Sequence, residues 1–289
     1  MSDFFTSISD TEDIRQGDVI RQVNPASGTT VRLGMVITAD CDIAWKKTGG
    51  RYTWLEILPM SAYIEGPWAQ DQLRKLSEKK SSRVCDSLNG QLRKRTPELT
   101  ALTHKSLVDW LHLKSAEEIL TAVSGEAPMP DAKPLRELKG FAHLVDSDTS
   151  KTPMTKLKAA WEVFGTDEKN QREAIRTAFK DTGGFQDYFV LPDLPRMLGY
   201  GFVVMLRAME TIMPPDLYLS EQDARIDDRP DAFHRLGRLS DGVRFAITQK
   251  LAFLFSRIGM PTTFETACAA ATDLMVEEFF KDTMEQAGS

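Results

Sequence analysis

Segments typical of β-strands occur near both ends of this chain, and a long segment typical of helices separates them. The β-type segments are rich in branched and aromatic side chains, which pack well on a pleated surface. They occupy residues 17–23, 29–38, 51–58, 188–191 and 200–209. The last segment suits a strand or a helix, and Gly199 and Gly201 favour the strand. Short strands joined by turns suit a small antiparallel barrel or a sandwich.

The middle of the chain is predicted to be helical. Pro67 suits a first helical turn, and the polar, basic residues 68–95 predict a helix that is broken near Asn89-Gly90. Shorter helices are expected at residues 98–113, 116–123, 135–144, 154–164 and 168–179. An apolar stripe at helical spacing predicts another helix after Ser240, and a capping-box pattern at residues 262–265 opens a final one.

This order of segments predicts an α+β fold in which strands from both ends of the chain join in one closed sheet. A length of 289 residues is enough for about two domains. The expected parts are a first part of the barrel at residues 14–66, a helical insertion at 67–185, a second part of the barrel with its helix at 186–261, and a terminal helix at 262–289. A long insertion adds little loop entropy, so this topology is permitted.

Charge and cysteine content limit the class of protein. The chain has 36 Lys and Arg against 42 Asp and Glu, a net charge of −6, which argues against attraction of the whole molecule to nucleic acid but permits a local basic patch. Three distant cysteines without a CxxC pair predict reduced thiols and neither a disulfide framework nor a cysteine-based zinc site. The N-terminus lacks the pattern of a signal peptide, and no apolar run approaches the length of a membrane span. We therefore expect a cytoplasmic protein.

Several short motifs, in their shared order, resemble the PemK/MazF toxin family. The opening Gly17-Asp18-Val19, the turn from Asn24 to Gly28, the strand Val31–Ile37 and the apolar strand Val203–Ile212 each resemble a motif of that family. The resemblance implies an SH3-like barrel. It also implies a ribosome-independent endoribonuclease, in which an arginine and a threonine make the RNA 2′-hydroxyl attack its own phosphate.

Carried over to this chain, the resemblance places the family's arginine at Arg32. The proline that follows this arginine in the family is replaced by Leu33 here. The position of the family's threonine falls on Met60 and Ser61, so Ser61 is the candidate hydroxyl. The residue type alone leaves two roles open for Arg32. Its guanidinium can donate to two oxygens of a phosphate, or it can pair with Asp40 or Asp42 at the mouth of the barrel.

A second resemblance concerns the segment Thr38 to Ile43, which is similar to the "TxxCD" turn of bacterial proteins found beside phage-defence or mobile-element genes. In an extended segment, Asp40 and Asp42 would share a face around Cys41, where they could hold a metal or activate water. The same residues also suit a plain turn in which the aspartates cap backbone donors. His234 is a further pocket candidate, although a histidine in a polar loop is commonly just solvated.

The first long helical segment carries a basic stretch. Its members are Arg74, Lys75, Lys79, Lys80, Arg83, Arg93, Lys94 and Arg95. Lysine and arginine without interleaved aromatic residues predict contact with a phosphate backbone and not base stacking. The alternative is a solvated helical face that docks on an acidic protein.

The sequence as a whole predicts an accessory or adapter protein that binds a macromolecular partner, either protein or nucleic acid. The phage-defence or mobile-element setting is implied by resemblance only, and the alternative function is the MazF-like endoribonuclease. Nucleotide-binding and hydrolase motifs are absent from the sequence, as are paired histidines at zinc-ligand spacing, so we expect no cofactor and no metal. Association with a membrane is not expected, and a homodimer stays open.

Overall fold

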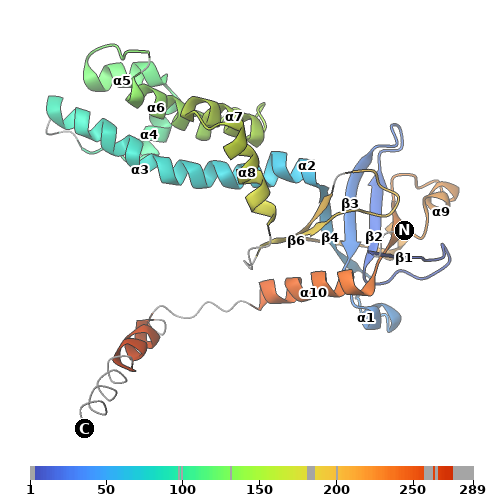
Figure 1. Ribbon diagram of the computed structural model, residues 1–289. Coiled ribbons are helices and arrows are strands. Elements are labelled where there is room, and N and C mark those ends of the chain that lie inside the picture. Colours follow the sequence, from blue (N-terminus) through green and yellow to red (C-terminus); the bar gives the residue numbers. More distant parts are fainter. Residues whose placement is uncertain are drawn as a thin grey trace, which may run out of the picture. The chain divides into compact units, whose positions relative to one another are not determined.

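The computed structural model combines a curled β-sheet with a set of helices (Figure 1). It describes residues 4–96, 98, 100–130, 132–180, 186–199, 201–256, 263 and 266–275. The chain divides into two compact units, residues 1–241 and residues 242–289. The first unit holds the whole sheet and the helices that lie between its strands in the sequence.

The sheet draws its strands from both ends of the first unit. The strands are β1 (Phe5–Thr6), β2 (Asp18–Val23), β3 (Thr30–Val36), β4 (Tyr52–Pro59), β5 (Tyr188–Leu191), β6 (Phe202–Ile212), β7 (Leu217–Tyr218) and β8 (Phe233–Leu239). Their order is β1-β8-β2-β3-β4-β6-β5, with β7 beside β8. The early strands pair antiparallel with the late ones, β4 with β6 and β2 with β8, so the prediction of one shared sheet is confirmed.

The sheet is a curled half-barrel and not the closed barrel that the strand pattern predicted. Its order begins at β1 and ends at β5, and among the strands described here these two do not pair with each other. The reason is visible in their lengths, because β1 has two residues and β5 has four. Strands this short offer few ladder hydrogen bonds with which to close a barrel.

One face of the half-barrel packs around Trp54. This side chain is 1% exposed and lies with Ile20, Val36 and Phe233 in a single apolar cluster. The ring occupies the space beside Gly34, where an added Cβ would come within 2.1 Å of Trp54 Cε3. Glycine in a strand interior often marks such a close approach, so Gly34 is what permits the tryptophan to lie against the sheet.

A nearly continuous helical stem leaves β4 and enters the helical part of the first unit. It consists of α2 (Met60–Tyr63), a π-helical turn at Ile64–Trp68 and α3 (Ala69–Arg95). The helices that follow are α4 (His104–Leu111), α5 (Ala116–Ser124), α6 (Lys133–Leu144), α7 (Pro153–Phe164) and α8 (Glu168–Phe179). Their apolar faces share one core, which also includes Tyr188 and Val203 of the sheet.

Helix α3 is unbroken, so the predicted interruption near Asn89-Gly90 is wrong. The side chain of Asn89 donates to the carbonyl of Leu102 at 3.0 Å and accepts from its N–H at 2.7 Å. These bonds tie α3 to the segment before α4. Gly90 weakens a helix by about 1 kcal/mol relative to alanine, and the burial of side chains such as Val84 and Leu88 exceeds that cost.

Helix α10 (Asp241–Phe255), all but its first residue in the second unit, confirms the helix expected after Ser240. The second unit also has helical residues at 263 and 266–275. Parts of the predicted C-terminal helices, residues 257–262, 264–265 and 276–289, lie outside the described residues. Across the described helices of both units, none is both long and apolar enough to cross a bilayer.

Candidate functional site

Strand β8 carries three buried polar side chains, of which the first, His234, was a pocket candidate in the sequence. His234, Arg235 and Arg238 are 2%, 3% and 6% exposed. The strand pairs with β2 along one edge and with β1 and β7 along the other, which places it inside the sheet. The apolar side chains of β8, Phe233, Leu236 and Leu239, recur at every third residue, so the strand lacks the alternation by which half-buried strands are recognised. His234 is therefore not solvated, which was the alternative to its role as a pocket candidate.

The two arginines of β8 surround the carboxylate of Asp18, which is 0% exposed. Arg238 donates from Nε to Asp18 Oδ1 at 2.6 Å and from Nη2 to Oδ2 at 3.2 Å. Arg235 Nη1 lies 3.5 Å from Asp18 Oδ2. The pKa of Asp18 is raised by its burial, against the opposing effects of the Arg238 bonds and the N–H of Arg15.

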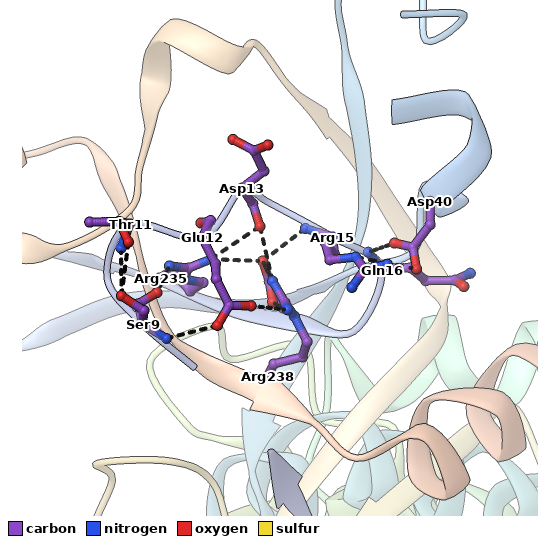
Figure 2. Close-up of polar contacts among 10 residues, drawn as sticks. Ser9, Thr11, Glu12, Asp13, Arg15, Gln16, Asp40, Arg235 and Arg238 are labelled. Atoms are coloured by element: carbon purple, nitrogen blue, oxygen red, sulfur yellow. Dashed lines mark hydrogen bonds and ion pairs between the residues drawn. The ribbon is translucent and has the colours of Figure 1, made fainter. Parts of the chain in front are cut away.

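The same guanidinium groups hold the loop that precedes β2 (Figure 2). Arg235 donates to the carbonyls of Ser9 at 2.9 Å and Glu12 at 2.8 Å. Arg238 donates to the carbonyl of Asp13 at 2.9 Å and to Glu12 Oε2 at 3.1 Å. The chain itself therefore satisfies both arginines, so this cluster, which we call the arginine clamp, stabilises the fold and does not offer its charge to a ligand.

Asp40, Cys41 and Asp42 lie in a short helix, α1 (Asp40–Ala44), and not in the extended turn that the sequence predicted. Residues two apart in a helix point about 200° apart, so the two carboxylates do not share a face. Asp40 accepts the Gln16 N–H at 2.8 Å and lies 3.7 Å from Arg15 Nε (Figure 2). A hollow of about 320 Å³ beside α1 is lined by Asp40 but by neither Cys41 nor Asp42.

The carboxylates and thiol near α1 therefore do not form the predicted pocket. Cys41 is exposed, and its Sγ lies 3.7 Å from Asp42 Oδ1. Within the part of the chain that the structure describes, no three histidine, cysteine, aspartate or glutamate side chains gather into a metal-binding group. His234 has Glu221 of α9 (Glu221–Ile226) as its carboxylate neighbour at 3.9 Å, and burial lowers the pKa of its imidazole.

Arg32 lies on β3 over the ring of Trp54, with its guanidinium carbon 4.6 Å from the ring centroid. It forms an ion pair with Glu210 of β6 and not with Asp40 or Asp42. The sequence missed Glu210 because only the pairing of β4 with both β3 and β6 brings it near Arg32. Ser61 is exposed in α2, and among the described hydrogen bonds it shares none with Arg32.

Half of the predicted basic stretch on α3 is engaged within the protein. Arg74 pairs with Asp71 at 2.8 Å and with Glu78 at 3.0 Å, and Lys75 pairs with Asp71 at 2.7 Å. The ammonium group of Lys80 lies 4.2 Å from the ring centroid of Phe164. Arg95 donates to the carbonyls of Ala122 and Val123, near the end of α5, at 3.0 and 3.3 Å.

The other half of the stretch faces solvent and carries free positive charge. Lys79, Arg83, Arg93 and Lys94 are exposed, and none forms an ion pair with any carboxylate in the described residues. At 3.6 residues per turn they lie within an arc of about 100° on one side of α3 and span about 22 Å along its axis. We call these four residues the basic face of α3. The opposite side of the helix packs on α5, α6 and α7.

Comparisons with known proteins identify no relative of this chain. No protein-family model matches the chain, and neither a curated protein nor a solved structure does. The resemblances to PemK/MazF toxins and to the "TxxCD" proteins therefore stay predictions.

Proposed function

We propose that the protein is an accessory protein that binds nucleic acid through the basic face of α3. The observation that carries this proposal is that Lys79, Arg83, Arg93 and Lys94 are exposed, lie on one side of one helix and lack carboxylate partners among the described residues. An unpaired surface cation keeps its full charge for a phosphate, and each contact releases counterions from the polymer.

Other cationic groups of the molecule are less suited to bind nucleic acid than the basic face of α3. The guanidinium groups of the arginine clamp are hydrogen-bonded to the protein itself. The net charge of −6 disfavours attraction of a polyanion to the molecule as a whole, so binding has to rest on a local basic surface. The basic face of α3 is such a local surface, and binding of an acidic protein is the alternative outcome of its test.

The finer fold assignment belongs to this proposal as well. We take the half-barrel as a divergent SH3-like, PemK/MazF-like sheet with α2 to α8 as a helical insertion. The support is the order of the motifs in the sequence and the pairing of early with late strands. The phage-defence or mobile-element setting and the cytoplasmic location stay predictions.

Fluorescence anisotropy with a labelled mixed-sequence nucleic acid tests the function. We expect the wild type to bind and Lys79→Gln with Arg83→Gln to weaken binding to all sequences alike, because phosphate contacts carry no sequence information. The matched control is Arg172→Gln, which removes an exposed helical arginine that is already paired with Glu168. A double variant that binds like the wild type, or a wild type that binds no nucleic acid at low salt, contradicts the proposal.

A second candidate function, metal-independent RNA cleavage, is favoured by one specific observation. Glu210 pairs with Arg32, whose guanidinium lies over the Trp54 ring, so a carboxylate that can accept a proton lies beside a cation that can contact a phosphate. Incubation of the protein with mixed RNA in the presence of EDTA tests it. Cleavage that is lost in both Arg32→Ala and Glu210→Gln supports this function, and Ser61→Ala tests the predicted hydroxyl. Intact RNA with the wild type excludes it.

A further inference from the structure

The charges on the exposed side of α3 are divided into two groups. Lys79 and Arg83 are one turn apart, and Arg93 and Lys94 follow about 15 Å further along the axis. Between the two groups, on the same side of the helix, lie exposed Asp86 and exposed Gly90. The face therefore presents two cationic pairs that are separated by a carboxylate and by a residue without a side chain.

Contacts to the neighbouring helices hold the helix that carries these pairs. Ser81 Oγ and His104 Nδ1 share a hydrogen bond of 2.6 Å, and Asn89 is bonded to the backbone of Leu102. Arg95 is bonded near the end of α5, next to the second cationic pair. The helix that carries both cationic pairs is thus tied to its neighbours at three points along its length. A ligand that contacts both pairs needs negative charges whose separation is similar to that of the two pairs.

We propose that the nucleic acid is double-stranded DNA, and that α3 lies across a groove with one cationic pair on each flanking row of phosphates. This inference rests on the proposed function. The major groove of B-form DNA is about 12 Å wide, comparable with the separation of the two pairs. In this arrangement Asp86 and Gly90 lie over the groove, where no phosphate row stands.

A single strand that runs along α3 fits the same face less well. It would bring a phosphate next to Asp86, where two negative charges repel each other. Helix α3 also contains no Phe, Tyr, Trp or His on which an unpaired base could stack. Double-stranded RNA is disfavoured because its A-form major groove is deep and narrow.

The test compares three probes of one sequence at one salt concentration: a 20-base-pair DNA duplex, the matching RNA duplex and the single DNA strand. We expect the DNA duplex to bind most tightly. We also expect Lys79→Gln with Arg83→Gln and Arg93→Gln with Lys94→Gln to weaken duplex binding by similar factors, because each pair serves one row of phosphates. Equal or tighter binding of the single strand or of duplex RNA overturns the inference while the proposed function stands. Failure of all three probes overturns both.

Asp86→Asn supplies a second readout that does not depend on the choice of probe. If Asp86 lies over the groove, its neutralisation strengthens duplex binding by a much smaller factor than the loss caused by either double variant. A gain as large as that loss would place Asp86 beside a phosphate and contradict the arrangement. All of these substitutions are on the exposed side of α3 and use glutamine or asparagine, so far-ultraviolet circular dichroism should match the wild type.

Discussion

Removal of Arg238 is expected to destabilise the protein more than the loss of any surface ion pair. In Arg238→Met, the carboxylate of Asp18 stays fully buried and keeps only Arg235, at 3.5 Å, and the backbone N–H of Arg15, at 2.9 Å, as partners. Truncation of one partner of a buried pair costs about 3–5 kcal/mol. Because Arg235 partly compensates the remaining charge, we expect a loss near the lower end, about 3 kcal/mol.

Urea denaturation followed by circular dichroism measures this change in the free energy of unfolding. The matched control is Arg229→Met, which breaks the pair of Arg229 with Asp216, where both side chains are 46% exposed and the distance is 2.8 Å. Such a surface pair contributes at most about 1 kcal/mol. The double variant Asp18→Asn with Arg238→Met also removes the unpaired buried carboxylate charge, so it should be more stable than Arg238→Met alone.

Two results would refute this reasoning. A loss below about 1 kcal/mol for Arg238→Met would mean that the buried carboxylate does not depend on Arg238, contrary to the magnitude expected for buried pairs. A double variant no more stable than the single one would mean that the cost comes from lost packing or lost loop contacts and not from the unpaired charge.

Three further predictions concern His234 and two glycines. Burial lowers the pKa of His234 below its unfolded value of 6.5, so the folded state favours the neutral ring. The free energy of unfolding therefore falls as the pH drops below 6.5, by at most about 1.4 kcal/mol per pH unit. His234→Gln should remove that component from the pH dependence of the unfolding free energy, and an unchanged slope contradicts it. Gly34→Ala should destabilise the protein by about 1–3 kcal/mol and so lower its melting temperature, since the added Cβ would meet the Trp54 ring at 2.1 Å. Gly90→Ala, which meets nothing within 4 Å in mid-helix, should instead stabilise by about 0.5–1 kcal/mol; a destabilised Gly90→Ala variant would show that α3 is strained there.

The elements that local patterns determine were predictable from the sequence. Branched residues and turn signals located β2, β3 and β4, and helical spacing located most of α5 to α8. The pairing of early with late strands was also expected. Helix α3 was predicted with a false break, because the bonds of Asn89 to Leu102 are tertiary and leave no local signal.

The candidate sites were predicted less completely, for a related reason. Strand β8 has arginines at buried positions, where Asp18 across the sheet and the carbonyls of the loop before β2 satisfy their guanidinium groups. The partner of Arg32 depends on strand register, which places Glu210 within reach. The basic stretch was visible in the sequence, but its division into engaged and free cations required the positions of Asp71, Phe164 and α5.

The salt dependence of DNA binding tests the central claim most directly. Each phosphate neutralised by a cation contributes about −0.9 to the slope of log K against log salt concentration. If Lys79, Arg83, Arg93 and Lys94 each contact one phosphate, replacing all four by glutamine makes the slope shallower by about 3.6, while Arg172→Gln leaves it unchanged. A quadruple variant with the same slope as the wild type would show that the basic face of α3 does not contact the phosphate backbone.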